Sequence, residues 1–298
     1  MNDLHAGIDS GCPLVTVVIP CFNMGATLTE SVESAANQTY RNLEIVVVDD
    51  GSTDLETLEI LKSLPSREFG DVAVRVFSKT NGGVGSAINF GVQQAAGKYY
   101  MPLGDDLIDA PYIYEAVEQM ERNPNLGIVY CRAEFFGKLQ GDWGLPDFDM
   151  SRQLWDNCIF ATSLYRTDDW KTVGGLDESM VGREDHDYIL KTLGLGRTVH
   201  RLEGRYFHYR REGFSVNDRV AADRAKLVDS TAKMFRNNLD LYGANAEIFV
   251  SWIYSLIDER NDLANKYRRL EKARNSLAGR MAVKVVRNAK ESIRKNRK

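Results

Sequence analysis

Three pairs of adjacent acidic residues are the groups best placed to do chemistry in this sequence of 298 residues. Asp49-Asp50 and Asp105-Asp106 each follow an apolar run directly, and Glu184-Asp185 opens a predicted helix. Neighbouring carboxylates repel each other, and a divalent cation with oxygen ligands would offset that repulsion. Alternatively, the first two pairs are solvated turn residues or helix N-caps. The third pair is either a helix cap stabilised by the helix dipole or a general base.

The elements that must position these pairs alternate along the first hundred residues. Apolar runs predict strands at 15–19, 43–48, 72–77 and 98–103. Helical spacing predicts helices at 26–37, 53–64 and 84–96, the second opened by a capping box of Thr53 and Glu56. This order predicts an α/β fold with a mostly parallel sheet and right-handed crossovers. Ligands bind at the carboxyl ends of such strands, where Phe22-Asn23 and the first two acidic pairs lie.

The second half of the sequence is less regular. We predict helices at 112–122 and 185–193, strands at 127–135 and 157–165, and a loop at 137–148. From residue 220 onward proline is absent and the pattern is helical. Leucines recur there every seven residues, at Leu256, Leu263, Leu270 and Leu277. That spacing indicates a short coiled-coil seam and a possible homo-oligomer.

Composition excludes several classes of protein. The longest apolar runs have about six residues, far short of the ~20 that a membrane-spanning helix needs. Residues 1–13 contain Asp3 and Asp9 and no apolar signal segment, so we expect a cytoplasmic protein. The four cysteines, at 12, 21, 131 and 158, form no CxxC pair. A disulfide framework or a cysteine-based zinc site is therefore not expected.

Charge is distributed unevenly around the net value of −4. Residues 266–298 carry 13 basic and 2 acidic side chains, a net charge of +11, which leaves −15 for residues 1–265. Residues 277–298 read as a basic amphipathic helix that lies on an anionic membrane surface, so the protein could be peripheral on the inner face of the membrane. The alternative is a solvated or disordered basic end. Nucleic acid is not an expected partner, because the body is acidic and contains no recognised binding module.

A set of short motifs carries a family resemblance. They are VVIPCFN at 17–23, SAANQTY at 34–40, EIVVVDDGSTD at 44–54, GDD at 104–106, VGGLD at 173–177, GRED at 182–185 and FHYR at 207–210. In this order the motifs resemble family 2 glycosyltransferases of the GT-A fold, of the bacterial polysaccharide-biosynthesis type. The likeness covers about 14–215. It implies a GT-A domain at 1–218, with a nucleotide-binding half at 14–106 and an acceptor half at 107–215. A C-terminal helical region follows at 219–298.

The resemblance also implies roles for individual residues. On the donor side it implies that Pro20 and Phe22 form the floor of the base pocket, with Asn23 beside them, and that Asp50 hydrogen-bonds the base. It also implies that the Gly82 and Gly83 amides lie near the diphosphate and that Asp105 faces the ribose. It implies Asp106 as a ligand of Mn²⁺ or Mg²⁺, His208 as a late ligand of the metal or diphosphate, and Asp185 as the catalytic base with Glu184 beside it. Trp155, Asn157 and Arg183 are candidate acceptor residues, with Trp143 and Trp170 nearby; the alternative is that these tryptophans are core or rim residues.

The implied reaction is an inverting single displacement. A sugar moves from a nucleotide-diphosphate sugar, with UDP favoured, to a hydroxyl of a glycan or lipid-linked acceptor. Two positions depart from the family pattern: Ile88 replaces an arginine and Leu103 replaces an aspartate. The diphosphate would then rely on the metal, on amides, or on another cation, for which the candidates are Arg183, Arg210 and Arg211.

Two other functions compete with this one. The departures at Ile88 and Leu103, together with the heptad leucines, favour a catalytically silent relative that assembles a complex through its C-terminal helices. The intact acidic pairs oppose that alternative. A nicotinamide-dependent oxidoreductase is disfavoured, because Gly83-x-Gly85 lacks its third glycine and follows the third predicted strand rather than the first.

Overall fold

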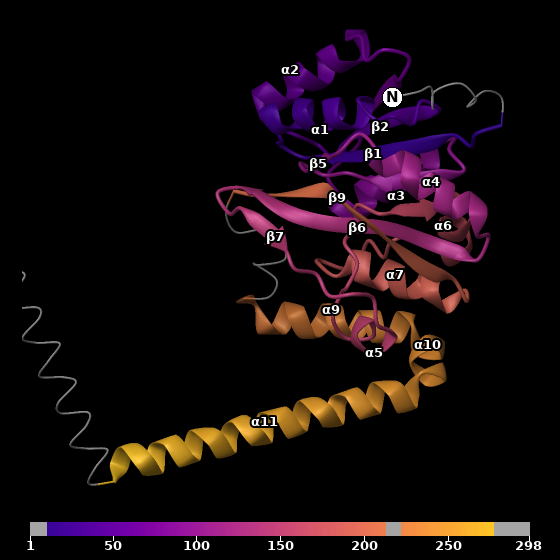
Figure 1. Cartoon of the computed structure of the whole chain (residues 1–298). Coiled ribbons are helices and arrows are strands. Elements are labelled where there is room, and N and C mark those ends of the chain that lie inside the picture. The colour runs from indigo at the N-terminus through magenta and orange to yellow at the C-terminus, as the bar shows by residue number, and fades with distance from the viewer. Residues whose placement is uncertain (1–10, 213–221, 277–298) are drawn as a thin grey trace, which may run out of the picture. The chain divides into compact units, whose positions relative to one another are not determined.

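The computed structural model describes residues 11–212 and 222–276, and within them nine strands form one mixed sheet (Figure 1). The strand order is β3-β2-β1-β4-β8-β6-β9-β5, with β7 paired to β6. The strands are β1 (Val15–Cys21), β2 (Leu43–Asp49), β3 (Ala73–Ser78), β4 (Tyr99–Pro102), β5 (Leu107–Ile108), β6 (Leu126–Gly137), β7 (Gly141–Trp143), β8 (Leu164–Arg166) and β9 (Thr198–Arg211).

Most of the helices lie between these strands in the chain. Those that precede β9 are α1 (Ala26–Ala36), α2 (Leu55–Ser63), the 3₁₀ turn η1 (Leu64–Ser66), α3 (Val84–Gln94), α4 (Tyr112–Arg122), α5 (Met150–Gln153), α6 (Thr167–Val173) and α7 (Glu184–Gly194). Those that follow it are α9 (Arg224–Asn237), α10 (Leu239–Ala244) and α11 (Ala246–Asn275). The boundaries of α4 match the prediction at both ends. The expected capping box is wrong, because α2 is capped by Asp54, whose side chain accepts from the Thr57 N–H at 2.9 Å.

The first half of the sheet is parallel, as predicted. β1 pairs in parallel with β2 and β4, and β2 pairs in parallel with β3. Every residue of β2 is buried, because α1 and α3 lie on opposite sides of this part of the sheet (Figure 1). Gly91 allows α3 to approach closely, since a Cβ there would lie 2.3 Å from the Val18 side chain. The carboxyl ends of β1, β2 and β4 therefore meet at one edge.

The second half of the sheet is mixed and differs from the prediction. β9 runs parallel to β6, and β8 lies antiparallel between β4 and β6. The strand expected at 157–165 is wrong except at its end, where β8 begins at Leu164, and the expected loop at 137–148 contains β7. The long strand β9 was not expected. It matters for function because it closes the sheet beside the short strand β5, which follows Asp105-Asp106.

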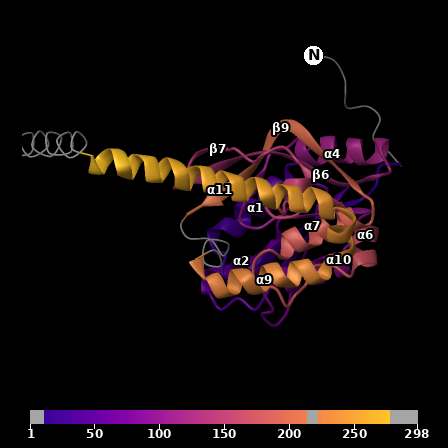
Figure 2. The same ribbon diagram turned by 90° about the horizontal axis from the view of Figure 1, so that it is seen from below.

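The chain divides into two compact units, Met1–Ala244 and Asn245–Lys298. Helices α9 and α10 belong to the first unit, and α9 runs beside α7 in both views (Figures 1 and 2). Met234 of α9 is fully buried, and the Asn238 side chain donates to Asp187 of α7 at 2.9 Å. The boundary expected at 218 therefore lies inside the first unit, which ends at Ala244.

The second unit contains α11, whose 30 residues include none that is buried. None of the helices that the structure describes is both long enough and apolar enough to cross a membrane. The last heptad leucine, Leu277, and the basic segment 277–298 lie outside the described residues.

Candidate functional site

Asn23 ties the loop after β1 to the loop after β2. Its side-chain Oδ1 accepts hydrogen bonds from the backbone N–H groups of Thr53 and Asp54 at 2.8 and 3.0 Å. Its own N–H donates to Ser52 Oγ at 3.0 Å. Asn23 has a φ of 52°, in the left-handed region that asparagine tolerates. These hydrogen bonds fix the loop that contains the neighbouring Phe22. Phe22 is 51% exposed, whereas Pro20 is half-buried within β1.

Asp50 is buried at the end of β2 and is surrounded by donors. Its carboxylate accepts from Lys79 Nζ at 2.7 Å, from the Gly82 N–H at 2.9 Å and from the Gly83 N–H at 2.8 Å. A buried carboxylate needs such donors to offset its lost hydration. The two amides expected near the diphosphate therefore face Asp50 in this structure. Lys79 was not among the expected site residues, although a basic residue directly after the third strand was a visible signal.

Asp106 lies in the turn between β4 and β5 and is only 7% exposed. Its Oδ1 accepts a hydrogen bond from the backbone N–H of Arg210 at 2.8 Å. Burial raises the pKa of the Asp106 carboxyl to about 8, opposed by that hydrogen bond. The adjacent Asp105 is exposed. Asp106 is thus held from β9, a strand far away in the sequence.

The Arg210 side chain adds a second tie to the same turn. Its Nε donates to the Asp105 carbonyl oxygen at 2.6 Å, and its guanidinium forms an ion pair with Glu30 of α1. The guanidinium also lies over the Phe136 ring, 4.5 Å from its centroid. Arg210 is therefore engaged by protein groups, and its position braces Asp105 and Asp106.

Glu184 and Asp185 form the first turn of α7, as predicted. Asp185 Oδ2 accepts a hydrogen bond from Asn157 Nδ2 at 3.2 Å. Burial raises the pKa of Asp185 above its ordinary value, although the His186 amide lowers it. Burial, and then the charge of Asp185, raises the pKa of Glu184 to about 7. Glu184 Oε2 is buried and makes no hydrogen bond to the described residues.

One cavity of about 200 Å³ brings Asp106, Asn157 and Asp185 together. These residues are far apart in the sequence, and they come from the β4–β5 turn, the segment after α5 and the start of α7. Most of the remaining lining is apolar or aromatic: Trp143, Leu145, Ile159, Phe160, Ala161, Thr162, Phe207 and Tyr209. The cavity thus combines two carboxyl groups of raised pKa with an apolar wall, an arrangement that fits a binding site with a few orienting polar groups.

Four aromatic rings form that wall. Trp143 stacks on Tyr209 with ring centroids 4.8 Å apart, and Phe160 stacks on Phe207 at 4.4 Å. Trp143 also lies against Phe160, at 6.0 Å. Trp143 was among the residues expected near the acceptor, whereas Phe160, Phe207 and Tyr209 were not. The spacing of Phe207 and Tyr209 was the available signal, because residues two apart on a strand share a face.

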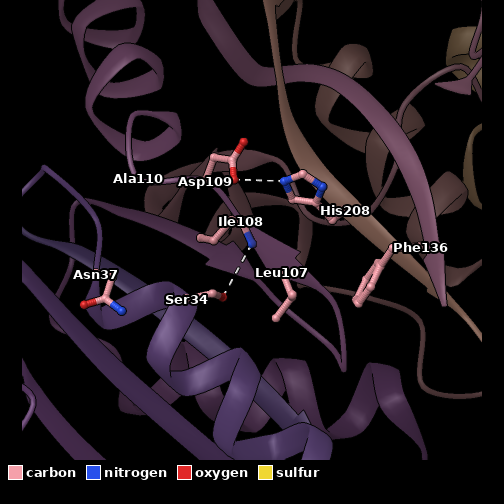
Figure 3. A pocket seen from close by; sticks show the side chains of 8 residues that line it. All are labelled: Ser34, Asn37, Leu107, Ile108, Asp109, Ala110, Phe136 and His208. Carbon is pink, nitrogen blue, oxygen red and sulfur yellow. Dashed lines mark hydrogen bonds and ion pairs between the residues drawn. The ribbon is translucent and has the colours of Figure 1, made fainter. Parts of the chain in front are cut away.

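His208 does not join Asp106, because it lies between Phe207 and Tyr209 on β9 and points to the opposite face. Its Nδ1 lies 2.9 Å from Glu134 Oε1. Its Nε2 lies 2.9 Å from Asp109 Oδ1, the contact drawn in Figure 3. It lines a second cavity of about 380 Å³ together with Asp109 and Phe136. The expected role of His208 as a metal ligand beside Asp106 is therefore not supported. Strand alternation is the physical reason.

Among the other acceptor candidates, Arg183 and Trp155 lie together. Arg183 precedes Glu184 with a φ of 67°, and its Nη1 donates to the Trp155 carbonyl oxygen at 3.3 Å. Trp155 is 41% exposed. In contrast, Trp170 Nε1 donates to Asn89 Oδ1 at 3.0 Å between α6 and α3, so Trp170 serves as a structural residue there.

Ile88 and Leu103, the two positions that depart from the family pattern, are core residues here. Ile88 is 4% exposed within α3, and Leu103 is fully buried after β4. Neither side chain is placed to contact a solvated ligand. The departures therefore leave the carboxylates of the candidate site intact.

The fit to a divalent cation rests on Asp106. No group of three or more His, Cys, Asp or Glu side chains suited to a metal occurs among the described residues. Asp106 nevertheless keeps a carboxyl at the cavity to which no cationic side chain of the described residues is bonded. Burial is the main cause of its raised pKa. Mg²⁺ commonly binds one or two carboxylates and takes its other ligands from substrate phosphates and water. The donor set fits a cation of that kind.

Comparison with protein families gives a direct match over most of the strands just described. The model of Glycosyl transferase family 2 matches residues 16–187. This chain belongs to that family. The match includes all three acidic pairs and ends inside α7, so the resemblance seen in the motifs is confirmed.

Relatives of similar sequence carry glycosyltransferase names. An uncharacterised glycosyltransferase of Rickettsia typhi is 33% identical over an alignment of 195 residues, and the match covers 61% of this chain and 59% of that protein. The chondroitin synthase of Pasteurella multocida is 28% identical over an alignment of 194 residues, and the match covers 63% of this chain and 20% of that protein. The match thus spans less than two thirds of the length of either relative.

Solved structures confirm the fold class. TarS 1–349 of S. aureus in complex with UDP-GlcNAc superposes with a TM-score of 0.58 and 20% identity, covering 80% of this chain and 79% of that one. The mannosyltransferase PcManGT of Pyrobaculum calidifontis, in complex with GDP-Man and Mn²⁺, has a TM-score of 0.56 and 17% identity, covering 90% and 82%. The chain therefore has the GT-A fold.

Proposed function

We propose that this chain transfers a sugar from a nucleotide-diphosphate sugar, with a UDP-sugar favoured, to a hydroxyl of a glycan or lipid-linked acceptor, with inversion. The observation that carries this proposal is the single cavity shared by Asp106, Asn157 and Asp185. In a single displacement, a base lies on one side of the anomeric carbon and the leaving diphosphate lies on the other. Asp185 would supply the base, and Asp106 would face the diphosphate.

Asp185 is the proposed general base. The acceptor oxygen forms a bond to the anomeric carbon while the bond from that carbon to the phosphate oxygen breaks. The hydroxyl proton passes to the Asp185 carboxylate, and the nucleoside diphosphate leaves with the electron pair. Burial raises the pKa of Asp185, which strengthens it as a base toward a hydroxyl. Asn157 donates to Asp185 and so fixes the direction of its carboxylate.

Asp106 is the residue proposed to hold Mn²⁺ or Mg²⁺. Bound there, the cation would act as a Lewis acid that neutralises charge on the departing diphosphate. The PcManGT complex contains Mn²⁺, which supports this assignment. Arg210 holds the backbone of the Asp105-Asp106 turn, so the carboxylate does not have to be ordered when the donor binds.

The donor base is proposed to lie against the exposed Phe22, which directly precedes Asn23 in the loop that Asn23 ties to the loop after β2. Asp50 and Lys79 shape the adjoining loop through the Gly82 and Gly83 amides. The acceptor sugar is proposed to stack on Trp143 and its neighbouring rings, because aromatic faces suit the CH-rich face of a sugar. Arg183 and Trp155 would border that site.

A panel of nucleotides with two variants tests the proposal. Thermal shifts with UDP, GDP, dTDP and CDP are measured in Mn²⁺, Mg²⁺ or EDTA. A ligand at ~100 times its Kd stabilises by ~2.7 kcal/mol, which is several degrees here. We expect one nucleotide to give such a shift and EDTA to abolish it.

The variants separate the two carboxylates. Asp106→Ala should lose the metal-dependent shift. Asp185→Asn should keep the shift and lose donor-to-acceptor transfer by about 10²- to 10⁴-fold. No shift with any nucleotide would favour the silent-scaffold alternative, and full transfer by Asp185→Asn would remove Asp185 as the base.

A further inference from the structure

Helix α11 carries an apolar stripe that the described residues of its own unit leave exposed. Leu256, Leu263, Tyr267 and Leu270 are 41%, 66%, 61% and 69% exposed. None of the 30 residues of α11 is buried. Most helical stability in proteins comes from packing of an apolar face, so a long helix with an open apolar stripe calls for a covering surface.

The spacing of this stripe is that of a heptad repeat. With Leu256, Leu263 and Leu270 at position d, position a holds Ile253, Arg260, Tyr267 and Arg274. The outward positions b, c and f from residue 258 to the end of α11 are all polar or charged: Asp258, Asn261, Asp262, Asn265, Arg268, Arg269, Lys272 and Asn275. A narrow a/d stripe with a polar remainder is the pattern of a coiled-coil seam rather than of a broad face that packs on a globular core.

The charges beside the stripe indicate which partner would cover it. Lys266 is at position g and Glu271 at position e, five residues later. Residues five apart do not face each other within one helix, but a g residue faces the e residue five positions later across a parallel, in-register pair. Glu271 otherwise contacts Arg274 of its own helix at 3.6 Å, an exposed contact of little strength.

A second pair of opposite charges, Glu259 and Arg260, lies one heptad earlier. Arg260 at position a interrupts the apolar stripe, and Glu259 at position g precedes it. In a parallel pair each a residue is flanked by the preceding g residue of the partner helix. Arg260 of one helix therefore meets Glu259 of the other, which offsets the cost of a charge in the seam. Both pairs of opposite charges require the parallel orientation and the same register.

We propose that α11 pairs with α11 of a second copy of this chain as a parallel, in-register two-stranded coiled coil. The interface uses residues of α11, none of which belongs to the proposed sugar-transfer site. It would place two glycosyltransferase-fold units in one assembly.

Light scattering of the full chain across concentrations tests the proposal. We expect a mass of twice 33.6 kDa at micromolar concentration. The double variant L263D/L270D should be monomeric. The matched control N261D/N265D, with the same charges at outward positions, should remain dimeric. Melting of the first unit and its nucleotide-induced shift report that each variant is folded.

Charge reversal tests the orientation. K266E and E271K alone should each weaken the dimer roughly five- to tenfold, and the double variant K266E/E271K should restore it. Failure of the double variant to recover would overturn the parallel register. A chain that stays monomeric at ~100 μM, or a dimer that survives L263D/L270D, would overturn the interface. Flotation of the monomer with anionic vesicles, lost in L263D/L270D, would instead assign the stripe to a membrane surface.

Discussion

At the scale of single residues, Glu184 stands out because backbone hydrogen bonds from Glu184 and Gly182 offset its burial only in part. Its carboxylate contributes an oxygen that makes no hydrogen bond within the described residues, and its pKa is raised from 4.5 to about 7. The folded protein therefore holds a proton on Glu184 more tightly than the unfolded chain does. The contribution of Glu184 to the free energy of unfolding therefore falls as the pH rises from about 4.5 to about 7, and it is constant above that range.

Replacing Glu184 by Gln should remove that pH-dependent loss. We expect E184Q to match the parent chain near pH 4.5 and to exceed it by about 2–3 kcal/mol at pH 8, because each pKa unit corresponds to ~1.4 kcal/mol. Chemical denaturation at several pH values measures this difference. E59Q, at an exposed residue of α2, is the control and should show no comparable trend. A constant difference between E184Q and the parent across the pH range would contradict the expectation.

The aromatic wall makes a separate prediction at the same scale. Trp143→Ala removes the ring that contacts both Tyr209 and Phe160. If the acceptor sugar stacks there, its KM should rise about tenfold, since such contacts contribute up to ~1.5 kcal/mol. The KM of the donor should not change, and Trp143→Phe should retain most of the affinity. Steady-state kinetics with each substrate varied in turn measure both constants, and an unchanged acceptor KM would move the acceptor elsewhere.

At the scale of elements, β9 performs two tasks on its two faces. Phe207 and Tyr209 line the cavity of Asp106, whereas the His208 and Arg210 side chains bind groups on the other side. The backbone N–H of Arg210 still reaches Asp106. One strand therefore supplies the apolar wall and the support of the acidic turn together.

Loss of the Arg210 side chain should loosen that turn without unfolding the protein. In Arg210→Ala the backbone N–H still donates to Asp106, but the bond to the Asp105 carbonyl oxygen and the ion pair to Glu30 are lost. We expect the Kd of the metal–nucleotide complex to rise about tenfold, which equals ~1.4 kcal/mol. Calorimetric titration measures it. Arg132→Ala, which removes an exposed arginine of β6, should bind normally, and equal affinities in the two variants would dismiss the bracing role.

The elements also show what a sequence can and cannot predict. β1 and β2 were predictable because strands buried on both faces are continuous apolar runs. The acidic pairs were found because they follow such strands or open a helix. β9 was overlooked because its charged and aromatic residues give no apolar run, and its partner β6 is about 70 residues away. His208 was misplaced because the face of a strand is unknown until its register is known.

At the scale of the molecule, the first unit needs its late helices. α9 and α10 lie after the matched family region, yet Met234 is fully buried and Asn238 donates to the buried Asp187. Tyr242 of α10 donates to the Leu154 carbonyl oxygen at 2.6 Å. These contacts hold the helix that begins with Glu184-Asp185.

Two truncations test this dependence. A chain ending at 244 should keep the melting temperature of the first unit and its nucleotide-induced shift. A chain ending at 218 should lose at least ~3 kcal/mol of its free energy of unfolding. It lacks the buried Met234 side chain, and it lacks Asn237 and Asn238, which donate to Asp187. Denaturant titrations of both chains measure the difference. Equal stability would show that α9 and α10 are dispensable.

The tie between Asp106 and Arg210 also sets the order of events during synthesis. The two residues are 104 positions apart. At ~5–20 residues per second, a ribosome needs of the order of 5–20 s to make the chain between them. When that interval begins, the ribosome has already made the parallel strands β1 to β4. The partner of β4, which is β8, and the strand that holds the Asp105-Asp106 turn, which is β9, are still to be made. A nascent chain can therefore collapse early but cannot assemble its site until most of the first unit has been translated.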